Sequence, residues 1–573
     1  MTIESKSHSK SGDGRPSSPS TVIHEEIHQR QTEGVADIAM IASKGGLDPE
    51  KPTQTHDGVR EEITANPTLG NDFGREDEEY ISGYRLFAAL FGITSVFFIV
   101  LLDFSIIATA IPYITSDFHR LQDAALQPLT GKLYTYLSAK RTFLFFVAIF
   151  EIGSLLCAVS TSSTFFILGR TVAGLGTSGL ENGALTLIAG AVPLHKRPFG
   201  QIGIVVGPLI GGALTQYVTW RWCFYINLPI GAVSGLFLFF THIPDETLKP
   251  PFSFALLRSI VPNLDLTGCA LFAPATVMFL LALQWGSTDY GWSSPTVIGL
   301  FAGSGATAIL FSLWEWRVGE EALIPFHLVK KRIVWTSTLQ NSFLFITNFV
   351  GATYVPIYFQ AVKGVGPSLS GVYTLPSILS QLLSLVVGGA LVGRLGYYLP
   401  FGVLGGATTA VACGLISTWN PNTPTAEWIG YQILFGLRGI ALQIAVISIQ
   451  HAVTPAQSPV AMAFLVFVQN LLAAIFTIVG NAVFTETLAR QVSVLAPSVS
   501  PEAALTAGGS AEAVRALLPP GSPELDGLLL AYSKSVNAVF YMLLGVAAVC
   551  FFAAWGMGWV DIRKKKEPEE NGA

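Results

Sequence analysis

Thirteen apolar segments of roughly 20 residues each constrain the fold of this chain more than any other feature, because each is long enough to cross a bilayer as an α-helix. The chain is 51% hydrophobic and only 12% charged, with a mean hydropathy of +0.52, which is too apolar for a soluble globule. We therefore predict an all-α polytopic membrane protein. The predicted spans are 86–112, 142–160, 165–190, 200–218, 223–242, 265–284, 295–316, 336–359, 370–392, 399–418, 428–450, 460–484 and 536–558.

The two ends of the chain are polar. Residues 1–83 contain almost no aromatic side chains and are predicted to form a disordered cytoplasmic tail. No basic stub followed by an apolar core begins the chain, so we expect no cleavable signal peptide. Residues 84–563 form the predicted transmembrane domain, and 564–573 a cytoplasmic C-terminal tail. The proline-rich stretch 485–535 is predicted to be an irregular extracellular loop between the last two spans.

The positive charges between the spans disagree with an odd number of crossings. If one more crossing lay between the first two spans, nearly all the basic loops would be cytoplasmic, which favours fourteen spans with both ends inside. The residues concerned are Lys132, Lys140, Arg141, His195, Lys196, Arg197, Lys249, Arg258, Lys330, Lys331, Arg332 and Arg394. The segment between Phe118 and Arg141 is too polar for a lipid-facing helix. We therefore predict that the second span is missing or truncated.

Several classes of function are disfavoured by the sequence. The five cysteines all lie in apolar runs without metal-ligand spacing, so no disulfide, metal or cofactor is expected. The net charge of -5 and the lack of a long basic stretch argue against nucleic acid as a partner. No loop combines a serine, cysteine or histidine with a plausible base, so we predict no catalytic residues and no enzyme. The expected partners are the lipid bilayer and small molecules.

One run of glycines is the sharpest local signal. Gly203, Gly207 and Gly211 repeat every four residues and form a smooth helix face that allows close helix packing. Gly212 extends this face, and Pro208 removes a backbone donor and bends the span. Glycine and proline in the middle of a long apolar segment indicate more than simple packing.

Five motifs, in order along the chain, resemble the major facilitator superfamily, and within it the fourteen-span drug:proton antiporters of fungi. The glycine run is similar to the antiporter signature on the family's fifth span. The other motifs are 102–112 on the first span, 167–176 with Arg170 and Gly174 on the fourth, 220–231 entering the sixth, and 354–376. The resemblance covers about 86–563 and implies two helical bundles with two extra spans. Thr135 stands where the family carries an acidic residue, so its gate-locking salt bridge is in question.

The resemblance also implies a function. It is the proton-coupled export of small amphipathic compounds such as drugs, toxins or secondary metabolites, by a monomer that alternates between two open states. The expected location is the plasma membrane, with the vacuolar membrane as the alternative. Two other readings stay open: a siderophore or basic amino-acid transporter on the same scaffold, and a membrane protein that does not transport because of the missing span.

Charged residues inside spans are costly and usually face a cavity or a partner. Asp103 precedes Pro112 by nine residues and Arg170 follows Phe165 by five, so both lie in the outer half of the membrane and are able to pair. A carboxylate neutralised alternately by an arginine and by a proton is a minimal coupling device; the alternative is a static structural pair. Glu151, near the middle of its span, is either a second proton carrier or a buried structural acid.

Weaker candidates for the substrate cavity are polar residues in other spans. Arg438 lies near the predicted bilayer centre, where a lone cation is expensive. Glu181 shares a helix face with Arg170 but lies three turns away. The amides of Gln284, Asn348 and Gln443 are candidates for lining a polar route, although such residues also serve as interhelical hydrogen-bonding groups.

Overall fold

The computed structural model describes residues 83–110, 116–191, 221–245, 247, 249–251, 253–287, 290–508, 510–519 and 521–562. Every regular element in these residues is a helix, which confirms the all-α prediction. Ten helical segments of this part of the chain are long and apolar enough to cross a membrane. The longer helices are α2 (Gly83–Ala110), α3 (Ser116–Tyr136), α4 (Ala139–Ala158), α5 (Ser163–Ala191), α8 (Asn227–Phe240), α10 (Leu266–Ser287), α11 (Pro295–Val318), α13 (Arg332–Ile357), α14 (Pro367–Leu395), α15 (Leu399–Ile416), α16 (Thr425–Gly436), α17 (Ile444–Ala452), α18 (Ser458–Leu495) and α21 (Pro523–Trp555).

Short helical turns connect and extend these helices. They are α7 (Trp222–Tyr225), α9 (Phe254–Ile260), η2 (Val261–Leu264), η3 (Gly319–Glu321), α12 (Phe326–Val329), η4 (Tyr358–Val362), η5 (Leu437–Ala441), α19 (Pro501–Ala507) and α20 (Ala511–Ala516). Each predicted span within the described residues coincides with a helix, and the predicted span 200–218 lies outside them. The two predicted tails also lie outside the described residues, except for residue 83 at the end of the first. Helices α5 and α8 are not among the ten segments. Glycine and polar residues lower the mean hydropathy of α5, whereas α8 is too short, with only 14 residues.

A helix occupies the region where the sequence predicts a missing or truncated second span. Helix α3 has 21 described residues, one more than α4, and it is too polar to count among the ten apolar segments. It packs against α5, α10 and α18, so Gln127 and Lys132 are buried against protein rather than exposed to lipid. The second span is therefore present as a polar helix.

The helices form two bundles with the same order of contacts. In the N-terminal bundle (α2, α3, α4, α5, α7 and α8), α2 packs against α5 and α8, and α3 against α5. In the C-terminal bundle (α13 to α18 and α21), α13 packs likewise against α17 and α21, and α14 against α16. The bundles meet mainly where α3 packs against α18. This arrangement confirms the predicted pair of bundles.

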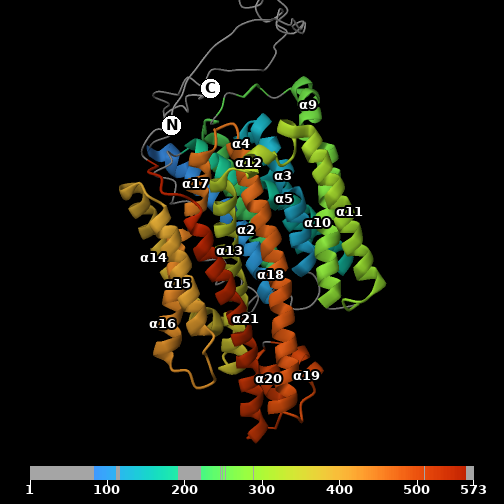
Figure 1. The fold of residues 1–573 in the computed structure, drawn as a ribbon, viewed down its shortest axis with the longest axis vertical. Helices are drawn as coiled ribbons and strands as arrows, with labels where there is room; N and C mark the ends of the chain where they lie inside the picture. Colours follow the sequence, from blue (N-terminus) through green and yellow to red (C-terminus); the bar gives the residue numbers. More distant parts are fainter. Residues whose placement is uncertain are drawn as a thin grey trace, which may run out of the picture. The chain divides into compact units, whose positions relative to one another are not determined.

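The two extra helices, α10 and α11, form a hairpin at one flank of the C-terminal bundle in Figure 1, with α14, α15 and α16 at the other flank. Lys132 of α3 holds one end of this hairpin by donating to the backbone oxygens of Asn263, at 3.0 Å, and of Glu321. Asp265 accepts hydrogen bonds there from the indole of Trp314, at 2.7 Å, and from the backbone of Leu323. The extra hairpin is therefore fixed to the N-terminal bundle by polar contacts.

The stretch 485–535 is mostly helical, so the prediction of an irregular loop is wrong. Helix α18 continues to Leu495, α19 and α20 follow, and α21 begins at Pro523, beyond the lower ends of the other helices in Figure 1. Pro501 and Pro523 each lie in the first turn of a helix, where proline is favoured because that turn needs no backbone donor. Arg515 of α20 donates to two backbone oxygens at η4, which anchors the short helices.

Candidate functional site

The N-terminal bundle contains a buried ion pair. Nη1 of Arg170, on α5, lies 2.5 Å from Oδ1 of Asp103, on α2, and the two residues are 3% and 2% exposed. The guanidinium also lies 5.6 Å from the ring centre of Phe224 on α7. The contact expected between Asp103 and Arg170 is therefore present, in a region shielded from solvent.

Glu151, on α4, is a second carboxylate beside this pair. Neither of its oxygens has a hydrogen-bond partner among the described residues, and its charge interacts electrostatically with that of Asp103. The carboxyl group fits against α8 because Gly231 has no side chain: a Cβ atom there would lie 1.8 Å from Oε1 of Glu151. Two carboxylates and one arginine thus share one site, a composition that suits proton exchange.

Arg438, in the C-terminal bundle, is buried among neutral groups. It lies in η5, the 3-10 segment that interrupts the helical run between α16 and α17, and it is 3% exposed. Its Nη2 donates to Oδ1 of Asn348, at 2.5 Å, and to Oε1 of Gln381, at 2.7 Å. Its Nη1 donates to the backbone oxygen of Phe435 at 2.6 Å. Two of the predicted cavity residues, Asn348 and Arg438, are therefore in direct contact.

Glu181 links the two bundles. Its Oε2 accepts hydrogen bonds from the amide of Gln127 on α3, at 2.9 Å, and from that of Asn470 on α18, at 2.8 Å. Glu181 is buried and far along α5 from Arg170, as predicted. The carboxylate thus joins α3, α5 and α18 by hydrogen bonds, a contact that we call the Glu181 clasp.

Replacing Glu181 with alanine is expected to lower the stability of the protein by about 2 kcal/mol, because the buried amide of Gln127 and the half-buried amide of Asn470 would lose their acceptor. Glu181→Gln keeps a carbonyl oxygen in place and should cost less than about 1 kcal/mol. Thermal unfolding in detergent micelles measures both. Equal melting temperatures for the two variants would contradict the clasp.

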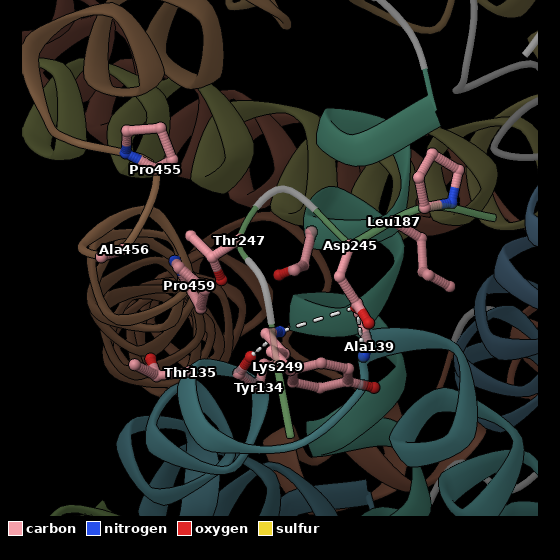
Figure 2. Close-up of a pocket in the computed structure, with 12 residues that line it drawn as sticks. Tyr134, Thr135, Ala139, Leu187, Asp245, Thr247, Lys249, Pro455, Ala456 and Pro459 are labelled. Atoms are coloured by element: carbon pink, nitrogen blue, oxygen red, sulfur yellow. Dashed lines mark hydrogen bonds and ion pairs between the residues drawn. The ribbon is translucent and has the colours of Figure 1, made fainter. Parts of the chain in front are cut away.

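Figure 2 shows a small cavity where the bundles meet, at the end that the charge pattern predicts to be cytoplasmic. Its volume is about 70 Å³, well below the roughly 300 Å³ of small ligand pockets, so it is too small for a transported compound. Asp245 accepts a hydrogen bond from the backbone nitrogen of Ala139, and Lys249 lies 3.6 Å from Asp245. The hydroxyl group of Thr135 donates a hydrogen bond to the backbone oxygen of Gly131 in its own helix, and a hydroxyl group cannot form an ion pair. The Lys249–Asp245 pair lines the same cavity as Thr135.

The other predicted residues are placed as follows. The glycine motif, Gly203, Gly207, Pro208, Gly211 and Gly212, lies outside the described residues. Gly174 is buried in α5. Gln443 is buried at the start of α17, and Gln284 lies on α10, away from the partners of Arg438.

Three polar residues of these sites are not among the sequence candidates: Gln381, Asn470 and Gln127. Gln381 and Asn470 lie inside apolar spans, which is the signal that marked Asn348 and Gln443. Gln127 lies in the polar segment assigned to a missing span. Only the packing of helices far apart in sequence distinguishes these residues from ordinary interhelical amides.

Comparison with known proteins agrees with this architecture. The family model described as Major Facilitator Superfamily matches residues 93–477. The chain is 52% identical to the MFS-type transporter calB of Penicillium decumbens over 89% of this chain and 95% of that protein. It is 48% identical to the MFS-type transporter pigP of Monascus ruber, over 93% and 95%. It is 42% identical to the efflux pump mlcE of Penicillium citrinum, over 91% and 98%. The chain therefore belongs to the Major Facilitator Superfamily and is a multi-pass integral membrane protein of the transporter class.

Proposed function

We propose that this protein is a proton-coupled efflux transporter that exports small amphipathic compounds from the cell by alternating access. The observation that carries the proposal is the buried Asp103–Arg170 pair and, beside it, the carboxyl group of Glu151, which has no hydrogen-bond partner among the described residues. The name of the relative mlcE, an efflux pump, supports the direction of transport. We place the protein in the plasma membrane, as a monomer.

The coupling follows from charge balance. Arg170 neutralises Asp103 in the closed pair, so protonation of Asp103 would remove the attraction between α2 and α5. Glu151 fills the space that Gly231 leaves, and its charge and that of Asp103 influence each other, so Glu151 is our candidate for exchanging the proton with that carboxyl group. The free energy that changes when a buried ion pair is broken is large enough to shift the equilibrium between two conformations of a transporter.

The apolar surroundings favour an amphipathic cargo. Apart from Glu181, Asp103, Glu151 and the two arginines, the polar groups of these sites in the described residues are mostly amides and hydroxyls. Such a lining favours molecules with a large apolar part and few charges, and it offers few acidic groups to a basic amino acid. This argues against the basic amino-acid alternative.

The test uses the purified chain in lipid vesicles with an imposed pH gradient and a fluorescent amphipathic dye. We expect the dye to move uphill, coupled to proton movement, and expect a protonophore to abolish its accumulation. Dye movement that is independent of the gradient would contradict proton coupling. Transport only by a variant with a lengthened α3 would instead mean that this chain is an inactive member of its family.

A further inference from the structure

The two bundles each contain one buried arginine on corresponding helices. Helices α2 and α5 of the N-terminal bundle correspond, by their contacts, to α13 and the run from α16 to α17 in the C-terminal bundle. Arg170 on α5 faces Asp103 on α2, and Arg438 in η5 faces Asn348 on α13. The same interhelical contact is thus made by a carboxylate in one bundle and by a neutral amide in the other.

Among the residues that the structure describes, this difference leaves the charge of Arg438 without a carboxylate counter-ion. Its four hydrogen bonds go to three neutral oxygens, those of Asn348, Gln381 and the backbone of Phe435. No carboxylate among the described residues forms an ion pair with it, and the titratable group that interacts with it is the thiol of Cys413. A buried cation without a counter-ion costs several kcal/mol, by the order of magnitude known for buried ions. A buried cation that bears this cost is typical of a site that binds an anion.

The two amides are oriented to help bind that anion. A guanidinium group has only donors, so each amide must turn its oxygen toward Arg438. Each amide then presents its NH₂ group as a further donor on the side away from the arginine. Asn348 is half-buried and Gln381 is buried, so Asn348 is the more accessible of the two amides.

We propose that Arg438, Asn348 and Gln381 form an anion-binding subsite in the C-terminal bundle, which takes a carboxylate or similar singly charged acidic group of the exported compound. The proposal rests on the proposed efflux function for its cargo. The binding chemistry is a charge-assisted hydrogen bond from the guanidinium with two amide donors, in a region of low dielectric where such bonds are strong. The favoured cargo is accordingly an amphipathic acid.

The variant Asn348→Asp tests the subsite without removing the arginine. It places a carboxylate where the amide oxygen lies 2.5 Å from Nη2 of Arg438, and so copies the Asp103–Arg170 pair. This internal counter-ion should stabilise the fold while competing with any external anion. The matched control is Glu486→Gln, which changes one charge at an exposed position of α18.

The probes are a fluorescent amphipathic dye with one carboxylate and the methyl ester of the same dye. In vesicles with an imposed pH gradient, Asn348→Asp should slow uptake of the acid at least tenfold and change that of the ester less than twofold. Glu486→Gln should change neither. Equal losses for acid and ester, or no loss for the acid, would overturn the subsite.

A binding measurement separates this proposal from the efflux proposal. The acid should raise the melting temperature of the unmodified protein in detergent by several degrees and leave that of Asn348→Asp unchanged. If the vesicles show no gradient-driven transport but this difference is found, the subsite stands and the efflux proposal fails. If sodium chloride stabilises the unmodified protein as well as the acid does, the site holds a free inorganic anion and the cargo assignment is overturned.

Discussion

Asp103→Asn is expected to abolish uphill, gradient-driven export while leaving the protein folded in the membrane. Asparagine has nearly the same shape as aspartate but cannot exchange a proton, and it leaves Arg170, which is 3% exposed, without its counter-ion. Removing one partner of a buried pair typically costs about 3–5 kcal/mol, so a lower melting temperature should accompany the loss of coupling. Dye accumulation in vesicles under a pH gradient, measured beside thermal unfolding in detergent, records both effects.

The double variant Asp103→Asn with Arg170→Gln separates stability from coupling. It removes both charges, so most of the lost stability should return, because neither member of the pair is left buried without the other. Uphill export should stay absent, because no titratable group remains in the pair. Restored gradient-driven export in the double variant would show that the pair only fixes helix packing, and that the proton is carried elsewhere, with Glu151 as the next residue to test.

The sequence predicts those parts of the coupling site that consist of charged residues, which are rare in membrane spans. Charged side chains are so unusual in apolar spans that Asp103, Glu151 and Arg170 stand out without a structure. Their depth along two helices was enough to predict the contact between Asp103 and Arg170. The contact between Arg438 and Asn348, which lie 90 residues apart, required the packing of α13 against the helices that follow α15.

The failures of sequence interpretation have two physical causes. Hydropathy measures how well a segment partitions into lipid, whereas α3 is packed among α5, α10 and α18, where polar side chains find protein partners. The segment therefore looked like a gap. Proline is an ambiguous signal in 485–535, because it disrupts a helix interior but favours the first turn of a new helix.

Gly176→Val is expected to disrupt the packing of α4 against α5 in the N-terminal bundle. A Cβ atom at Gly176 of α5 would lie 2.6 Å from the backbone nitrogen of Phe150 on α4, and one at Gly153 of α4 would lie 2.2 Å from that of Ala173. The atoms in the way are backbone, so only separation of α4 from α5 makes room. Overpacking of this kind typically costs about 1–3 kcal/mol where side chains yield, and we expect at least the upper value here.

The close approach of α4 and α5 also sets the geometry of the coupling site, because Glu151 lies next to Phe150 on α4 and Arg170 lies on α5. Gly176→Ala should lower the melting temperature and the valine variant should lower it further, with export falling in the same order. Gly305→Val is the matched control, since nothing lies within 4 Å of a Cβ atom at that position of α11. A graded loss of melting temperature at position 176, with no loss at position 305, is expected only if the backbones of α4 and α5 are in contact. Equal melting temperatures of Gly176→Val and Gly305→Val would mean that the two helices are not in contact there.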